Sequence, residues 1–233
     1  MTGVQAAAET QMERRTIVPS EPVPIRVVLA DDHPVFRAGL RRTLEESGGI
    51  RVVAEASTGD EALKHLRAQP VDVLVLDVFM PGMGFIDLLR RARAEFPKTR
   101  ILVVSMQPEE QCAVRAFRAG AAGYLPKDRP AETLVTAVRT VAEGRRFFSP
   151  ALAERLISGL DPTSARLPHE TLSDREYEVL CLIGAGRSVK EIAYGLALSP
   201  KTVGTYRTRL MRKMGADSSA ELVRYAVQQG LSA

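Results

Sequence analysis

The sequence contains no tryptophan, and only two cysteines and three histidines occur among its 233 residues. The two cysteines, Cys112 and Cys181, are far apart in apolar contexts, which argues against a disulfide framework or a cysteine metal site. We expect both to be buried thiols. No apolar run reaches the roughly 18 residues that span a bilayer, and residues 1–24 lack the apolar core of a signal peptide. These absences predict a cytoplasmic protein without a membrane partner.

The length and the charge suggest two domains and an anionic partner. A chain of 233 residues exceeds the usual size of one domain. Hydrophobic residues make up 45% and charged residues 26%, as in ordinary globular proteins. The formal net charge of +4 and the pI of about 9.3 favour an anionic partner, although the distribution of charge matters more than its sum. Residues 1–24 show no periodicity and predict a flexible tail.

Residues 25–145 alternate short apolar runs with helix-like segments. Runs rich in Val, Ile and Leu that alternate with helices are typical of a parallel sheet covered on both faces. The pattern therefore predicts an α/β domain with a doubly wound, five-stranded parallel sheet. The expected strands are 25–30, 51–55, 71–76, 100–104 and 122–125, and the expected helices are 34–47, 59–68, 86–96, 108–119 and 130–143.

The strand pattern ends before residue 149, and the rest of the chain predicts a linker and a small all-α domain of four helices. Residues 146–170 are rich in Pro, Gly, Ser and Thr, as linkers are, with room for a short helix at 151–160. Residues 171–233 show helix signals throughout. Ser173, followed by Glu176 three positions later, predicts a capping box at the first helix. Further helices are expected at 189–195, 200–214 and 217–229.

Polar residues stand where four of the predicted strands end. Asp31 and Asp32 follow the first strand, Asp77 the third and Ser105 the fourth, and Lys127 lies just beyond the fifth. In open parallel sheets, ligands bind at the carboxyl ends of the strands. Three carboxylates gathered there would repel one another, and oxygen ligands of this kind favour Mg²⁺. A carboxylate can also act as a nucleophile and form an aspartyl-phosphate.

Four segments carry a resemblance to a known family. They are Val28–Pro34, Leu76–Gly82, Val103–Ser105 and Gly120–Asp128. On these segments, residues 25–145 resemble the receiver domain of two-component response regulators, which has a flavodoxin-like fold. The resemblance implies that a sensor histidine kinase phosphorylates this domain in the presence of Mg²⁺.

The resemblance also implies a role for each of seven residues. Asp77 would be the phosphoacceptor. The Mg²⁺ ligands would be Asp31 (through water), Asp32, Asp77 and the backbone carbonyl of Phe79. Ser105 and Lys127 would contact the phosphoryl group, and Tyr124 would be an aromatic switch that moves inward as Ser105 moves. One position departs from the family, which often has glycine where this chain has Phe85. Here the glycine is Gly84, which predicts an altered loop shape.

Two other polar features of this domain are expected to take no part in binding. His33 follows the two aspartates, but one imidazole beside a site for a hard cation suggests a surface or packing role. The basic run 90–93 is expected to be a solvated helix face.

The C-terminal segment combines a helix-turn-helix spacing with one basic helix. Two helices, 189–195 and 199–214, flank a tight turn, as in motifs whose second helix enters the major groove of DNA. Residues 199–214 contain five basic residues and no acidic residue, whereas the segment 170–233 carries only +2 overall. Concentration of positive charge on one helix is what phosphate contacts require.

Three motifs in this segment closely resemble the LuxR-type helix-turn-helix: Leu172–Leu180, Lys190–Ala193 and Leu198–Val203. Together with the receiver resemblance, they make the chain similar to NarL/FixJ-type response regulators. The resemblance implies that DNA phosphates are contacted by Lys201, Thr202, Arg207 and Arg209. It implies that base edges are faced by Gly204, Thr205 and Thr208. Lys190 is implied as a further DNA contact. Gly204 has no side chain for readout. Val189 and Tyr206 stand where the family usually has Asn and His.

The last predicted helix carries apolar residues, including Leu222, Val223 and Tyr225. In the family this helix pairs two DNA-binding domains, which implies a homodimer on a two-fold related site. Packing within its own domain is the alternative, and the two roles can share residues.

These features predict a phosphorylation-switched transcription factor rather than an enzyme. Its expected partners are a sensor histidine kinase and promoter DNA, with RNA polymerase a further candidate. An aspartate-nucleophile phosphatase is the first alternative, but the Asp-x-Asp motif expected after the first strand is missing. A DNA-binding protein with a vestigial receiver is the second, and the intact acidic residues and Lys127 argue against it.

Overall fold

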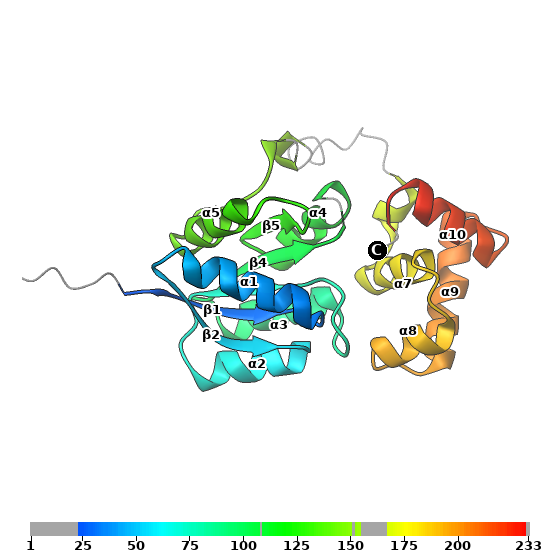
Figure 1. The fold of residues 1–233 in the computed structure, drawn as a ribbon. Helices are drawn as coiled ribbons and strands as arrows, with labels where there is room; N and C mark the ends of the chain where they lie inside the picture. The colour runs from blue at the N-terminus through cyan, green and yellow to red at the C-terminus, as the bar shows by residue number, and fades with distance from the viewer. Residues whose placement is uncertain (1–22, 108, 151, 155–166, 232–233) are drawn as a thin grey trace, which may run out of the picture.

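The computed structural model describes residues 23–107, 109–150, 152–154 and 167–231. The tail expected over 1–24 lies outside these ranges except for residues 23 and 24. Of the short helix expected over 151–160, residues 152–154 are described and are helical. Within the described residues the chain forms an N-terminal α/β domain and a C-terminal helical domain (Figure 1).

The α/β domain is built on a five-stranded parallel sheet with the order β2-β1-β3-β4-β5. Its strands are β1 (Ile25–Ala30), β2 (Ile50–Ala56), β3 (Val73–Leu76), β4 (Arg100–Ser105) and β5 (Gly123–Pro126). All neighbouring pairs are parallel, and the order reverses direction between β1 and β3. The doubly wound sheet expected from the sequence is confirmed.

Helices cover both faces of this sheet, which is why its strands are almost continuously apolar. One face is covered by α1 (Pro34–Glu46) and α5 (Ala131–Ala142), whose Leu44 and Val138 share a core with strand residues such as Leu29. The other face is covered by α2 (Gly59–Ala68), α3 (Phe85–Glu95) and α4 (Glu109–Ala119). With both faces sealed, the edge where the strands end is the place left for polar chemistry.

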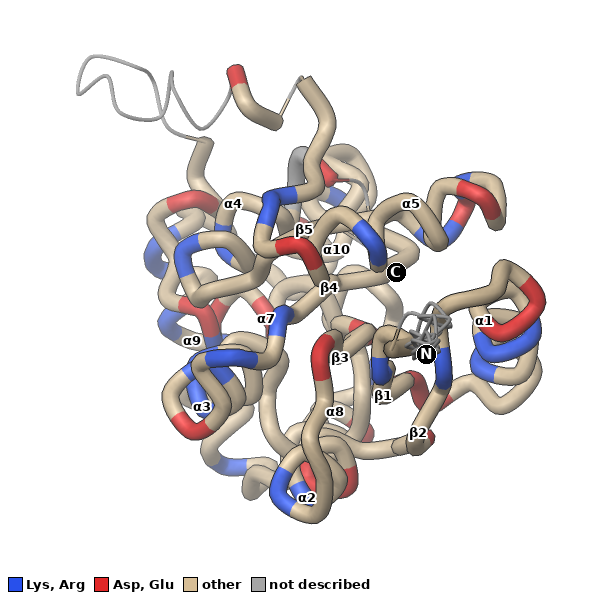
Figure 2. The backbone as a smooth tube through the Cα atoms, turned by 90° about the vertical axis from the view of Figure 1, so that its left-hand side faces the viewer, with Lys and Arg blue, Asp and Glu red and all other residues tan. Residues whose placement is uncertain are grey.

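Helix α1 carries charges of both signs on its surface. Along α1, basic and acidic residues follow one another (Figure 2). Arg41 pairs with Glu45 at 3.3 Å and Arg42 with Glu46 at 2.8 Å, each four residues apart. Exposed pairs of this kind contribute little to stability, so α1 is a solvated face.

The C-terminal domain consists of a 3-10 helix, η1 (Pro168–Thr171), and four α-helices. These are α7 (Asp174–Gly184), α8 (Val189–Gly195), α9 (Pro200–Met214) and α10 (Ser219–Gln228). Side-chain caps explain where they begin. Ser173 and Glu176 form the expected capping box at α7. The last helix starts two residues later than expected because Ser218 caps it by accepting a bond from the Glu221 N–H.

The helical domain has its own hydrophobic core, which includes Leu180, Val203 and Leu210. Its α7 faces the edge of the α/β domain where the strands end (Figure 1). The backbone N–H of Gly82, after β3, donates to the Gly195 carbonyl at 2.7 Å across this contact. Among the described residues, no helix is long and apolar enough to cross a membrane.

Candidate functional site

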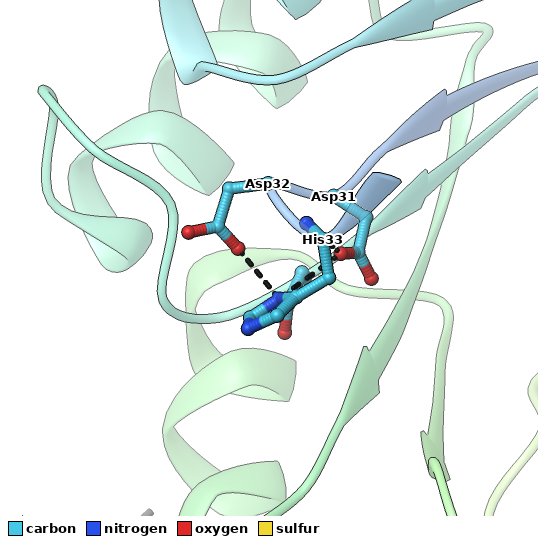
Figure 3. A group of neighbouring side chains, drawn as sticks. Asp31, Asp32 and His33 are labelled. Atoms are coloured by element: carbon cyan, nitrogen blue, oxygen red, sulfur yellow. Dashed lines mark hydrogen bonds and ion pairs between the residues drawn. The ribbon is translucent and has the colours of Figure 1, made fainter. Parts of the chain in front are cut away.

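Two adjacent strands bring carboxylates to one point at the edge of the sheet. Asp31 follows β1 and Asp77 follows β3, and the Asp77 N–H donates to the Ala30 carbonyl at 2.8 Å. Ligand atoms of Asp31, Asp32, His33 and Asp77 all lie within 4.8 Å of one another. Figure 3 shows the first three of these side chains converging from the loop after β1. The sequence prediction that these carboxylates share a pocket agrees with this geometry.

Lys127 provides the positive charge of the pocket. Its Nζ lies 2.7 Å from Asp31 Oδ2 and 2.7 Å from Asp77 Oδ2, and its side chain is only 4% exposed. The Lys127 N–H donates to the Ser105 carbonyl at 2.7 Å, which ties the loop after β5 to the end of β4. One ammonium thus bridges two carboxylates, and the third, on Asp32, adds a further negative charge.

The Asp77 carboxylate is buried and oriented. Burial raises its pKa above the ordinary value, while the charge and hydrogen bond of Lys127 act in the opposite direction. The Val78 N–H donates to Asp77 Oδ1 at 2.7 Å. The ionised form of Asp77 therefore depends on nearby positive charge.

His33 takes part in the pocket more closely than its expected surface or packing role. Its ring is 67% exposed, but Nδ1 lies 2.8 Å from Asp32 Oδ1 and 3.3 Å from Asp31 Oδ1, as the dashed lines in Figure 3 mark. The sequence signal was available, since His33 directly follows the two aspartates.

The donor set fits a hard divalent cation. Asp32 Oδ1 is buried and, within the described residues, accepts no hydrogen bond of satisfactory geometry, although the His33 ring is close. A buried oxygen without a donor is costly, and a cation would remove that cost. Three carboxylates against one ammonium leave a net charge that a hard, oxygen-liganded cation such as Mg²⁺ would balance.

Ser105 and Tyr124 lie behind the pocket on β4 and β5, and both are buried. Ser105 Oγ accepts a bond from the Gln107 N–H at 3.1 Å, and the Tyr124 hydroxyl donates to the Gln107 carbonyl at 3.0 Å. Burial raises the pKa of Tyr124 well above its ordinary value. In this structure the Tyr124 ring is already buried, and its movement together with Ser105 stays a prediction.

The loop after Asp77 explains the position of its glycine. Gly84 precedes α3, and a Cβ there would collide with the guanidinium of Arg175 on α7. The neighbouring Phe85 is buried as the first residue of α3, and its N–H donates to Glu178 Oε1 at 3.1 Å. Glycine at 84 rather than 85 therefore suits a loop against which the helical domain packs.

The basic run of α3 also contacts α7 of the helical domain. Arg90, expected on a solvated face, pairs with Asp174 of α7 at 2.7 Å. Arg115 on α4 reaches the other oxygen of the same carboxylate at 3.1 Å. Such contacts between distant parts of the chain have no local sequence signature.

The expected DNA-contacting residues lie mostly on the open surface of α9. Thr202 and Gly204 are half-buried, and the other expected contacts are exposed: Lys190, Lys201, Thr205, Arg207, Thr208 and Arg209. A shallow surface hollow is lined by Thr205, Thr208, Arg209 and Arg212. Arg212 was not among the expected contacts, although its helical spacing from Thr208 places both on one face.

The residues expected to pair two copies differ in exposure. Leu222 is 0% exposed in the core of its own domain, which supports the packing alternative for that side chain. Val223 and Tyr225 are half-buried, and the Tyr225 hydroxyl lies 2.8 Å from His169 Nδ1. Pairing through α10 stays a prediction.

Family models match both domains: "response regulator receiver domain" over residues 27–139 and "bacterial regulatory proteins, luxR family" over residues 170–226. The response regulator UvrY of Escherichia coli K12 is 38% identical over 208 residues, which cover 89% of this chain and 95% of UvrY. The chain belongs to the two-component response regulators with a LuxR-type DNA-binding domain. It is therefore a two-component transcriptional regulator of the NarL/FixJ type.

Other relatives agree with this assignment. The response regulator GacA of Pseudomonas aeruginosa is 36% identical over 89% of this chain and 97% of its own length. A solved structure of the RcsB response regulator of Salmonella typhimurium is 30% identical, covers 88% of this chain and 98% of that chain, and has a TM-score of 0.69.

We expect Mg²⁺ to stabilise the folded chain through the acidic pocket of this response regulator. At a free Mg²⁺ concentration ten times the Kd, the gain in unfolding free energy is about 1.4 kcal/mol. Asp32→Asn removes a charged oxygen ligand and should abolish most of this gain, as measured by urea unfolding with and without Mg²⁺. Asp128→Asn, the same change at an exposed residue of the receiver, should keep it. Equal stabilisation of Asp32→Asn and the unaltered chain would contradict the assignment.

Proposed function

We propose that Asp77 accepts a phosphoryl group from a sensor histidine kinase and that this modification controls sequence-specific DNA binding. The proposal rests on one observation: a buried carboxylate at a strand end with the Lys127 ammonium 2.7 Å away. Such a pair suits a reaction in which negative charge is added to the carboxylate.

The chemistry follows from the positions of the residues. An oxygen of Asp77 attacks phosphorus, the bond from phosphorus to the kinase imidazole breaks, and the imidazole leaves with its electron pair. Lys127 already contacts Asp77 Oδ2 and can follow the added phosphoryl oxygens. Asp31, Asp32, Asp77 and the carbonyl of Phe79 would hold Mg²⁺, which supplies charge neutralisation when bound.

Ser105 and Tyr124 would report the modification to the rest of the domain. The Ser105 hydroxyl lies at the end of β4, and in this proposal it would donate to a phosphoryl oxygen on Asp77. Its movement would take away the acceptor of the Gln107 N–H. The proposal thus joins phosphorylation to the loop that follows β4.

The exposed face of α9 would enter the major groove of promoter DNA. In this assignment the phosphate contacts come from Lys201, Thr202, Arg207 and Arg209. Lys190 on α8 is a further DNA contact. Gly204, Thr205 and Thr208 face the bases, where the two threonine hydroxyls now donate to carbonyls four residues earlier in α9. Val223 and Tyr225 would contribute to pairing two copies, with RNA polymerase a further partner.

Related structures support this part of the proposal. A structure of RcsB from Salmonella enterica, 26% identical to this chain with a TM-score of 0.63, is bound to the rprA promoter in the presence of the phosphomimetic BeF3-. Another, 28% identical with a TM-score of 0.54, shows two RcsB dimers bound to DNA. We extend both properties to this chain as proposals.

The alternatives fit the structure less well. A phosphatase would have no use for an exposed basic helix in a second domain. A vestigial receiver would not be expected to keep Asp31 and Asp77 each within hydrogen-bonding distance of Lys127. We therefore propose a regulator without turnover of a separate substrate.

Asp77→Asn should block phosphoryl uptake, because the amide is not a nucleophile of comparable strength. The phosphorylated fraction is measured by mass spectrometry of the intact protein after incubation with acetyl phosphate and Mg²⁺. Asp128→Asn serves as the matched control and should be labelled normally. Labelling retained by Asp77→Asn would place the phosphoacceptor elsewhere.

Arg207→Ala should weaken binding to all DNA sequences alike, because the side chain is assigned to a phosphate. Titration of DNA duplexes at several salt concentrations should show the slope of log K against log salt reduced by about 1. Arg51→Ala removes an exposed arginine from β2 and should leave the slope unchanged. A loss confined to one base position would argue for base readout instead.

A further inference from the structure

Gln107 connects the phosphorylation pocket with the DNA-binding domain. It lies in the loop between β4 and α4 and is buried. Its side-chain Nε2 donates to the carbonyl of Leu231 at 3.1 Å, a contact between residues 124 positions apart. None of the roles assigned above includes this residue.

The backbone of Gln107 is held by the two residues proposed to respond to the phosphoryl group. Its N–H donates to Ser105 Oγ at 3.1 Å, and its carbonyl accepts from the Tyr124 hydroxyl at 3.0 Å. Both bonds are buried, so neither side chain can move without changing the environment of the Gln107 peptide groups. A displaced Ser105 hydroxyl would leave a buried N–H without its acceptor, which is costly.

The other end of the connection is the end of α10. Leu231 is fully buried, and its N–H donates to the Ala226 carbonyl at 2.7 Å, which closes the turn after the helix. The Leu231 carbonyl is therefore fixed to α10, the helix proposed to pair two copies. A bond to this carbonyl holds the end of α10 against the receiver.

We propose that Gln107 is the positioning residue that couples the phosphorylation pocket to the docking of the DNA-binding domain. This inference rests on the proposed phosphorylation of Asp77. When Ser105 and Tyr124 shift, the Gln107 backbone shifts with them, and its side chain releases the Leu231 carbonyl. Loss of this bond weakens the docking of the two domains and favours release of α10 for pairing.

The Gln107 side chain is only partly satisfied in the docked arrangement. Gln107 Oε1 is buried and, among the described residues, has no hydrogen-bond partner. The unsatisfied acceptor offsets part of the stabilisation that the bond from Gln107 to the Leu231 carbonyl provides. A modest shift of the backbone is enough to tip such a balance.

Docking in this structure leaves the DNA-contacting face of α9 on the surface. The exposed side chains of Arg207 and Arg209 show that the receiver does not cover it. Docking involves α7 and the end of α10 instead, through contacts such as Arg90 with Asp174 and Gln107 with Leu231. Release of Gln107 is therefore expected to act on pairing before it acts on individual DNA contacts.

The two cysteines of the chain supply a built-in reporter of docking. Cys112 on α4 is 2% exposed and Cys181 on α7 is 1% exposed. Both line one cavity of about 20 Å³ between the domains, together with Gln107. Such a cavity has room for about one water molecule and not for a maleimide. Parting of the domains is expected to uncover the side of each thiol that faces this cavity.

The test measures the rate of modification of each thiol by N-ethylmaleimide in the full chain, with and without beryllofluoride and Mg²⁺. In the unaltered chain, beryllofluoride should accelerate modification. Gln107→Leu removes the donor and should raise the rate roughly tenfold without beryllofluoride, and beryllofluoride should then add little. Gln69→Leu is the matched control, because Gln69 donates to the Val53 carbonyl within the receiver.

Gln107→Glu provides a second variant of almost unchanged size that also cannot donate when ionised. It should behave as Gln107→Leu does. Uptake of phosphoryl from acetyl phosphate at the normal extent shows that the receiver of each variant is folded. If both variants are labelled normally yet keep slow basal modification and the full response to beryllofluoride, the coupling role is overturned.

Failure of the proposed function has a different signature. If the chain takes up no phosphoryl group at all, the phosphorylation proposal fails, whatever the thiols do. If Asp77 is phosphorylated but thiol modification in the unaltered chain does not change, phosphorylation stands and the coupling through Gln107 fails.

Discussion

Parallel strands bring carboxylates to one edge of the sheet, and the site depends on positive charge that neutralises their repulsion. Asp31 and Asp77 are buried at neighbouring strand ends, and each lies 2.7 Å from the Lys127 ammonium. Without that ammonium, burial would favour the protonated form of Asp77, as the direction of its pKa shift indicates. The unbalanced negative charge destabilises the folded site. The same carboxylates can bind a cation, and Asp77 can accept a phosphoryl group.

This local imbalance is linked to the rest of the molecule through short, buried connections. On one side, the loop after Asp77 packs against α7, where Gly84 leaves room for Arg175. On the other side, Ser105 and Tyr124 hold the backbone of Gln107, whose side chain reaches Leu231. A change at Asp77 can therefore reach the DNA-binding domain through a few hydrogen bonds, from Ser105 to Gln107 and from Gln107 to Leu231. Coupling through packed, contiguous groups of this kind needs no large rearrangement of the sheet.

Most of the fold could be predicted because its signals are local. Apolar strands that end in aspartates and helix starts marked by Ser173 or Ser199 depend on neighbouring residues alone. The shared pocket followed from a general rule, since parallel strands end at the same edge. Family resemblance added the roles of Ser105, Tyr124 and Lys127, which spacing alone does not give.

What escaped prediction depends on contacts between residues far apart in the chain. The pairing of Arg90 with Asp174 and the bond from Gln107 to Leu231 join two domains that the sequence treats separately. Tyr124 is buried with the core of its own domain, but the bond from its hydroxyl to the Gln107 carbonyl joins residues that spacing does not bring together. For His33, a single imidazole beside a site for a hard cation favours a surface or packing role, and its adjacency to the aspartates in sequence does not fix the 2.8 Å contact of its ring with Asp32.

A crystal structure of the full chain with Mg²⁺ and beryllofluoride tests the central claim most directly. The account predicts beryllofluoride on the Asp77 carboxylate, with Lys127 Nζ and Ser105 Oγ within hydrogen-bond distance of it and Mg²⁺ bound by Asp32. Beryllofluoride attached to another residue, or Lys127 turned away from the acidic pocket while Mg²⁺ binds elsewhere, would contradict it.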